Sequence, residues 1–242
     1  MKVYKELLSH LGEKSKNSCS LIALIDPDKK NKNNLNSQIK YINSNSQFCA
    51  VFVGGSLIMD SNFKSRVEVI KESINLPVIS FPASSGQINE NFDAILFLSL
   101  ISGRNPHYLI GEQVISSPII YDLKKEVIPV GYILLDGGSC TAVEVISGTK
   151  SLPMDNHDII LAHALASQYL GHKFIYLECG SGANRYIDLD LLSAIKDCVD
   201  IPIIVGGGIK NHKDISRIAT AGADFIVISS LIENIVNNES VY

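Results

Sequence analysis

Eight short apolar runs, rich in β-branched residues and bounded by polar or glycine-containing segments, most strongly constrain the fold of this 242-residue chain. Most of them lack the alternation of apolar and polar residues that a strand with one exposed face shows. Both faces of each strand are therefore expected to be buried, as in parallel strands covered by helices. The runs are residues 20–25, 50–53, 77–81, 94–98, 132–135, 174–177, 202–205 and 225–229.

The segments between most of these runs have the apolar spacing of helices, for example at Leu35, Ile39 and Ile42. Eight strands that alternate with helices over about 250 residues predict a (β/α)8 TIM barrel. A doubly wound open sheet is the alternative, but such a sheet rarely needs eight parallel strands. Neither a linker nor an internal repeat divides the chain, so we expect a single TIM-barrel domain over residues 1–242.

Two connections depart from the regular pattern. Residues 82–93 leave little room for a crossover helix, because such a crossover needs ~10–12 residues. We therefore expect an extended or one-turn segment in place of the third helix. Residues 137–153 are rich in Gly, Ser and Thr, and we expect a mobile loop there before the next helix.

Composition excludes several classes of function. The chain has 21 Lys and Arg against 25 Asp and Glu, a net charge of −4, so it lacks the basic surface that nucleic-acid binding requires. Its apolar runs are far shorter than the ~20 residues of a transmembrane helix. The N-terminal residues show no signal peptide, and we expect a cytoplasmic protein. The five cysteines form no Cys-x-x-Cys pair, so reduced thiols are expected.

The residues that follow the sixth, seventh and eighth runs are rich in glycine and serine. In a TIM barrel these positions lie at the active-site face, and exposed backbone N–H groups there can hold a phosphate. A tight strand-to-helix turn is the alternative role of one Gly-Gly-Gly sequence. The combined positions favour a phosphate site.

Asp26 and Ser56 end the first and second runs. A carboxylate and a hydroxyl, completed by waters and by phosphate oxygens of a substrate, suit Mg²⁺. The alternative role of Asp26 is that of a turn or capping residue. Lys29 could contact a diphosphate or begin a solvated helix.

Glu178 ends the sixth run beside a glycine-rich loop, which makes it a candidate general base for a hydroxyl of a phosphorylated substrate. A capping or ion-paired role is the alternative. The six histidines show no metal-ligand spacing, and we expect them to serve in packing or at the surface.

Five segments at or near the expected strand ends form a specific set of motifs. They are residues 24–29 (Leu-Ile-Asp-Pro-Asp-Lys), 53–56 (Val-Gly-Gly-Ser), 128–134 (Ile-Pro-Val-Gly-Tyr-Ile-Leu), 176–182 (Tyr-Leu-Glu-Cys-Gly-Ser-Gly) and 205–209 (Val-Gly-Gly-Gly-Ile). With them the chain resembles the geranylgeranylglyceryl phosphate synthase family, which includes bacterial heptaprenylglyceryl phosphate synthases. The likeness covers residues 21–233 and is greatest to the second of the two groups in this family.

The resemblance implies a modified TIM barrel without a regular third helix and a prenyltransferase activity. Such an enzyme joins the 3-hydroxyl of sn-glycerol 1-phosphate to a polyprenyl diphosphate through an ether bond, with Mg²⁺, and releases diphosphate. It also implies a homo-oligomer, a dimer or a hexamer. The residues leave open whether the protein makes a transient contact with the membrane to meet its lipid substrate.

Carried over to this sequence, the resemblance makes Asp26 and Ser56 the metal ligands and Glu178 the base. The implied glycerol phosphate site consists of Tyr176, Leu177, Glu178, Cys179, Gly180, Ser181, Gly182, Gly207, Gly208, Ser229 and Ser230.

The chain departs from the family at two places. It has Ser229-Ser230 where the family has Gly-Asn or Gly-Thr, and Ala83 where the family has glycine after Phe-Pro. Serine and alanine lack the conformational freedom of glycine.

Two other functions are compatible with a phosphate-binding barrel. One is a sugar-phosphate isomerase or epimerase, with Asp26 or Asp136 as a second acid or base. The other is a catalytically silent barrel that binds a phospholipid precursor.

Overall fold

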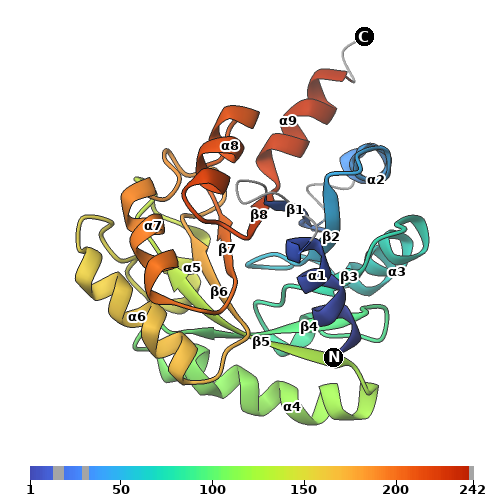
Figure 1. Ribbon diagram of the computed structural model, residues 1–242. Helices are drawn as coiled ribbons and strands as arrows, with labels where there is room; N and C mark the ends of the chain where they lie inside the picture. Colours follow the sequence, from blue (N-terminus) through green and yellow to red (C-terminus); the bar gives the residue numbers. More distant parts are fainter. Residues whose placement is uncertain (13–18, 29–32, 240–242) are drawn as a thin grey trace.

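The structure, a computed structural model, describes residues 1–12, 19–28 and 33–239. In these residues eight parallel strands close into one barrel in chain order (Figure 1). The predicted TIM barrel is confirmed, and the open sheet is excluded because the first strand pairs with the eighth. The strands are β1 (Ser20–Ile25), β2 (Phe48–Val53), β3 (Val78–Ser80), β4 (Ala94–Leu100), β5 (Glu126–Leu134), β6 (Phe174–Glu178), β7 (Ile203–Gly206) and β8 (Phe225–Ile228).

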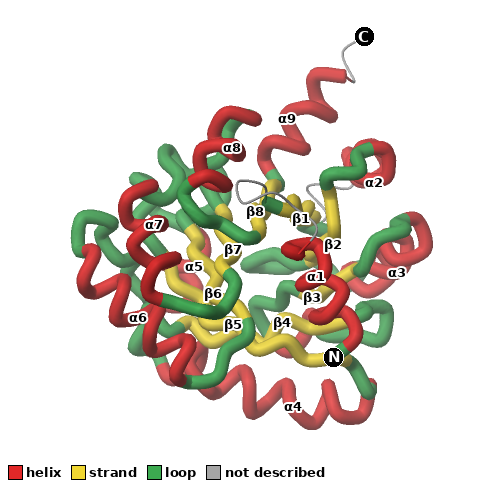
Figure 2. Tube along the Cα trace, in the orientation of Figure 1, coloured by secondary structure: helices red, strands yellow, loops and turns green. Residues whose placement is uncertain are grey.

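Helices surround the strands (Figure 2). They are α1 (Lys2–Gly12), α2 (Leu35–Ser44), α3 (Phe63–Ser73), the π-helical turn η3 (His107–Gly111), α4 (Glu112–Leu123), α5 (Ala142–Ser147), α6 (His157–Tyr169), α7 (Leu189–Cys198), α8 (His212–Thr220) and α9 (Ser230–Glu239). The first helix, α1, is held by the carboxylate of Glu126 at the start of β5, which accepts the backbone N–H groups of Lys2, Val3 and Tyr4 at 2.5, 2.9 and 2.8 Å. This carboxylate satisfies the N–H groups that the first turn of a helix leaves without partners.

Most of the strands are continuous apolar runs because they pack against two apolar cores, one inside the barrel and one between the barrel and the helices. In β6, Phe174 and Tyr176 belong to the core inside the barrel, whereas Ile175 and Leu177 belong to the core between barrel and helices. Successive side chains of a strand point to opposite faces, and here both faces are buried.

The connection between β3 and β4 agrees with the sequence prediction. It contains a single 3₁₀ turn, η2 (Ser85–Gln87), and no crossover helix. Its short path brings Phe81, Pro82 and Ala83 to the top of the barrel, where they line the pocket described below.

Two predicted boundaries are corrected. The strand expected at residues 132–135 begins at Glu126, because Pro129 and Gly131 interrupt the apolar pattern without interrupting the pairing with β4. Gly131 is required there, since a Cβ atom would lie 1.9 Å from Ser167 Oγ. Where we expected a mobile loop at residues 137–153, the structure has α5. A capping box begins this helix, in which Thr141 Oγ1 accepts from Glu144 N and Glu144 Oε2 accepts from Thr141 N.

Candidate active site

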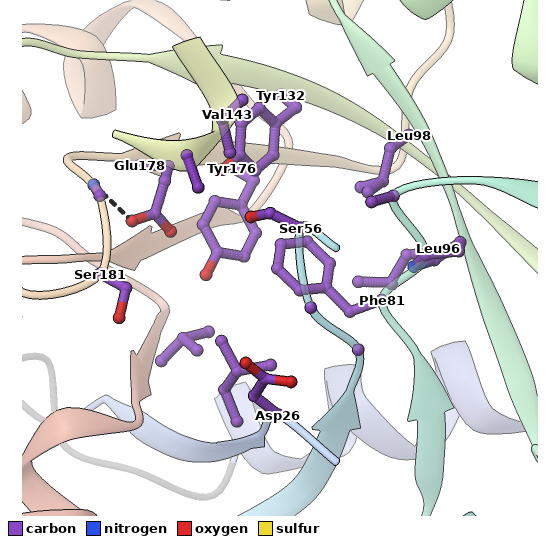
Figure 3. Close-up of a pocket in the computed structure, with 18 of the residues that line it drawn as sticks. Asp26, Ser56, Phe81, Leu96, Leu98, Tyr132, Val143, Tyr176, Glu178 and Ser181 are labelled. Atoms are coloured by element: carbon purple, nitrogen blue, oxygen red, sulfur yellow. Dashed lines mark hydrogen bonds between the residues drawn. The ribbon is translucent and has the colours of Figure 1, made fainter. Parts of the chain in front are cut away.

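A pocket of about 380 Å³ opens at the C-terminal ends of the strands, where the sequence predicts the active site (Figure 3). It brings together all but two of the residues that the family resemblance assigns to the metal, base and glycerol phosphate sites. Those that line it are Asp26, Ser56, Tyr176, Glu178, Gly180, Ser181, Gly182, Gly207, Gly208, Ser229 and Ser230. Lys29 lies outside the described residues.

The two candidates that do not line the pocket are Leu177 and Cys179. Both are buried in the core between barrel and helices. They alternate with Tyr176 and Glu178 along the chain, so their side chains point away from the pocket. Burial raises the pKa of the Cys179 thiol well above its ordinary value, which leaves it protonated and unreactive.

Glu178 is the most unusual titratable group of the site. Its side chain is buried, and Gly180 N donates a hydrogen bond of 2.6 Å to its Oε1 (Figure 3). Burial raises its pKa from the ordinary value of 4.5 to about 7, against the opposing effect of the Gly180 N–H and the nearby Tyr176 hydroxyl. A carboxyl group with this pKa exchanges protons near neutral pH, as a general base must.

The loop after β7 shows why glycine is needed beside this carboxylate. Gly207 has a φ of +85°, and a Cβ atom there would lie 2.6 Å from both Glu178 Oε1 and Gly180 N. Any other residue would displace the loop or the carboxylate. Gly207 and Gly208 thus form, with residues 180–182, a concave stretch of main chain that a phosphate can approach closely.

Asp26 and Ser56 lie on neighbouring loops after β1 and β2. A Cβ atom on Gly55 would lie 2.6 Å from Asp26 Oδ1, so the two loops are in close contact. Asp26 Oδ1 also accepts the Asp28 N–H at 3.1 Å, which is the turn interaction that the alternative interpretation predicts. Asp26 therefore shapes its own loop and also faces the pocket.

The two departures from the family do not strain the main chain. Among the described residues, Lys124 is the only one other than glycine with a positive φ, so Ala83, Ser229 and Ser230 have ordinary backbone conformations. Ser230 begins α9, and the Ser229 hydroxyl donates to Glu233 Oε1 at 3.3 Å. The N-terminus of α9 thus faces the pocket, and its first turn also brings the carboxylate of Glu233 to the pocket wall.

The sequence analysis did not identify the apolar arm of the pocket. Leu96 and Leu98 line this arm, and Val143 and Ile146 add further apolar lining to the pocket. Three aromatic rings lie between the two leucines and Glu178, with centroid distances of 5.3 Å for Phe81 and Tyr176 and 5.2 Å for Tyr132 and Tyr176 (Figure 3). Phe81 and Tyr132 lie within predicted strands. Sequence alone does not show that both rings stack on Tyr176 of β6, Phe81 from the residue after β3 and Tyr132 from β5.

Other candidates lie elsewhere. Asp136 accepts the Gly138 N–H at 2.8 Å, approaches Arg185 at 3.6 Å and does not line the pocket. Of the two candidates for the second acid or base of the isomerase alternative, only Asp26 therefore lines the described pocket. No histidine is among the residues that line the described pocket.

Two features are absent from the part of the chain that the structure describes. Among these residues, no cluster of three or more His, Cys, Asp or Glu side chains could hold a metal ion, and no helix is long and apolar enough to cross a membrane.

The closed barrel, the glycine-rich loops at its C-terminal face and the buried carboxylate define a TIM barrel with a candidate phosphate site at the usual active-site face. Residues 14–241 match the model of the PcrB family. The geranylgeranylglyceryl phosphate synthase of Flavobacterium johnsoniae is 44% identical over 234 residues, which cover 96% of each chain. The chain belongs to the PcrB family, together with these synthases, and the resemblance drawn from the sequence is confirmed.

Two solved structures agree with this assignment. The GGGPS of Thermoplasma volcanium superimposes with a TM-score of 0.86 at 34% identity, covering 98% of this chain and 94% of the other. The synthase of Thermoplasma acidophilum, solved in complex with its substrate sn-glycerol-1-phosphate, gives a TM-score of 0.84 at 31% identity, with 96% and 92% covered.

Proposed function

We propose that the protein is a Mg²⁺-dependent prenyltransferase that acts as one domain over residues 1–242. It joins the 3-hydroxyl of sn-glycerol 1-phosphate to a polyprenyl diphosphate through an ether bond and releases diphosphate. The observation that supports this most is the position of Glu178, a buried carboxyl with a pKa of about 7 between a glycine-rich loop and an apolar arm. Its relatives are named as synthases of geranylgeranylglyceryl phosphate, and one of them is solved with its substrate sn-glycerol-1-phosphate.

The glycerol phosphate fits the glycine-rich side of the pocket. Gly180, Gly182, Gly207 and Gly208 all have positive φ and line it, and α9 begins beside them. Backbone N–H groups at such positions bind a phosphate dianion without an arginine, at about 1.5–3 kcal/mol for each charged hydrogen bond. We propose that Tyr176, Ser181 and Ser230 complete this site, and that Leu177, Cys179 and Ser229 contribute only main chain.

The donor set near Asp26 fits Mg²⁺, which takes few protein ligands and completes its shell with water and phosphate oxygens. One carboxylate and one hydroxyl stand on loops in contact, and both line the pocket. We propose that Asp26 and Ser56 hold the ion. When bound, Mg²⁺ would neutralise the diphosphate and make it a better leaving group.

The prenyl chain fits the apolar arm. The apolar side chains of Leu96 and Leu98 would bury an isoprenoid, and the rings of Phe81, Tyr132 and Tyr176 lie between them and Glu178. The π faces of aromatic rings stabilise positive charge, which develops on the allylic carbon as its bond to diphosphate breaks. The arm thus suits the apolar tail of the prenyl group, and the rings suit its allylic carbon.

In the proposed reaction Glu178 takes the proton of the 3-hydroxyl, and the hydroxyl oxygen forms a bond to the allylic carbon. The carbon–oxygen bond to diphosphate breaks, and the diphosphate leaves with the electron pair. The proton ends on Glu178 and then passes to solvent, so the reaction balances.

The test is incubation of the protein with Mg²⁺, sn-glycerol 1-phosphate and prenyl diphosphates of increasing length, followed by mass spectrometry of a butanol extract. A prenylglyceryl phosphate that disappears when Mg²⁺ is chelated supports the proposal and identifies the preferred chain length. Absence of product with every donor, from folded protein, would reject it in favour of a silent barrel or a sugar-phosphate enzyme.

We further propose that the protein is cytoplasmic, contacts the membrane transiently to reach its lipid substrate, and assembles as a dimer or a hexamer. The outward face of α4 favours assembly with a second copy. Gln113 and Ser116 of this helix are buried, whereas Val114, Ile115 and Ile119 are 64%, 51% and 39% exposed. An apolar face of this kind is typical of an interface. Light scattering should give a multiple of the 26.4 kDa chain mass, and Ile115→Glu should lower it.

A further inference from the structure

Asp26 and Ser56 lie on two loops that one side chain of α3 connects. The two residues follow different strands, and a metal site with only two protein ligands is sensitive to the distance between their loops. Arg66 of α3 contacts both loops. Its Nε donates to the carbonyl oxygen of Pro27, next to Asp26. Its guanidinium donates to both carboxylate oxygens of Asp60, at 2.7 and 3.2 Å, in the loop that follows Ser56.

Arg66 is well placed for this role. Its side chain is only 13% exposed, and Phe63 and Val67, on either side of it in α3, are buried in the core. A planar guanidinium with several fixed donors can hold a carbonyl and a carboxylate at once, which a lysine ammonium does less well. A second contact ties the same loops, because Asp28 Oδ2 accepts the Met59 N–H at 2.8 Å.

We propose that Arg66, through Pro27 and Asp60, is a positioning residue that sets the distance between Asp26 and Ser56 for the metal and diphosphate. This inference rests on the proposed function, because it deepens the proposed Mg²⁺ site. Arg66 does not line the pocket, and it acts through the two loops that do.

The structure offers a matched control on the same helix. Lys71 of α3 pairs with Asp93 at 2.7 Å, and Asp93 also accepts the Val78 N–H at the start of β3. This pair lies toward the opposite end of α3 from Arg66, so Lys71→Met removes an ion pair without affecting the loops of Asp26 and Ser56.

The experiment measures binding of Mn²⁺, as a probe for Mg²⁺, by electron paramagnetic resonance without turnover, and then the KM of each substrate. For Arg66→Met, Arg66→Lys and Asp60→Asn we expect the Kd of Mn²⁺ and the KM of the prenyl diphosphate to rise about tenfold, a change of about 1.4 kcal/mol. The KM of glycerol phosphate should stay within about twofold, since its cradle lies on other loops. Lys71→Met should leave all three constants unchanged.

Two outcomes would overturn the inference. One is unchanged Mn²⁺ binding in Arg66→Lys and Asp60→Asn, which decides the case even if Arg66→Met fails to fold. The other is an equal loss in Lys71→Met, which would indicate general destabilisation. Asp26→Asn separates the inference from the proposed function. If the wild type binds Mn²⁺ no better than Asp26→Asn, the metal site itself is wrong. If it binds better and the Arg66 variants equal the wild type, only the role of Arg66 is wrong.

Discussion

The backbone N–H of Gly180 donates a 2.6 Å hydrogen bond to Oε1 of Glu178, and this contact orients the only carboxylate that combines deep burial with a place in the described pocket. The hydrogen bond stabilises the ionised form, whereas burial stabilises the protonated form and has the larger effect. The result is a group that is ionised in about half of the molecules near pH 7. A base that is poised in this way, with a fixed orientation, suits the abstraction of a proton from an alcohol.

The pH dependence of kcat/KM should report this carboxyl group. Only ionised Glu178 can accept the proton, so kcat/KM should rise tenfold per pH unit at low pH and level off above a pKa of about 7. Steady-state assays from pH 5 to 9, at saturating Mg²⁺, give the profile. A profile that is flat over this range or falls toward alkaline pH would exclude Glu178 as the base.

Stability should respond to the same group. A carboxyl whose pKa is higher in the folded state than its ordinary value of 4.5 binds protons more tightly when folded, so its burial destabilises the fold as the pH rises from 4.5 through about 7. Glu178→Gln removes this cost. The free energy of unfolding of the variant, relative to that of the wild type, should therefore be about 1–3 kcal/mol higher at pH 8 than at pH 4. Urea unfolding at both values measures the difference, and a difference independent of pH would contradict it.

Gly207→Ala should abolish most activity. The added Cβ would lie 2.6 Å from Glu178 Oε1 at a φ of +85°, and displacement of a catalytic group by about 1 Å can cost about 100-fold in rate. Gly171→Ala is the matched control, because Gly171 also has a φ of +85° but nothing lies within 4 Å of its Cβ position. Both variants should lose about 1–2 kcal/mol of stability from the backbone strain. Equal activity in the two would refute the role of the Gly207 loop.

Ser229→Ala tests the last phosphate loop. The Ser229 hydroxyl donates a hydrogen bond to Glu233, and the backbone of Ser229 has an ordinary conformation. We therefore expect the KM of glycerol phosphate to change less than about threefold, because the hydroxyl contacts Glu233 and the proposed phosphate contacts are made by backbone N–H groups. An increase of tenfold or more would show that the hydroxyl binds the phosphate directly.

Much of the fold could be predicted because its strands are buried on both faces. Their short apolar runs stand out from the helices, and the residues that follow them converge at one face of the barrel. Asp26, Ser56 and Glu178 could be assigned to that face from this rule alone. The absence of a crossover helix between β3 and β4 could also be predicted, because residues 82–93 leave little room for one.

The remaining features depend on contacts between distant residues. The start of β5 was missed because Pro129 and Gly131 resemble a strand boundary, and only the packing of Ser167 against Gly131 explains that glycine. The helix α5 is built from a segment rich in loop-forming residues, and its Thr141–Glu144 capping box could have indicated it. Leu177 and Cys179 were included with a contiguous motif, although alternation along a strand already places them on the other face.

The most direct test of the central claim is a single-turnover reaction with Mg²⁺, sn-glycerol 1-phosphate and labelled prenyl diphosphate, performed with wild type, Glu178→Gln and Asp136→Asn. Asp136 is the carboxylate at the adjacent strand end that lies outside the pocket. We predict ether product from wild type and Asp136→Asn, and a loss of about 100-fold or more in Glu178→Gln with glycerol phosphate binding retained. Undiminished product from Glu178→Gln, or loss of product in Asp136→Asn alone, would contradict the claim.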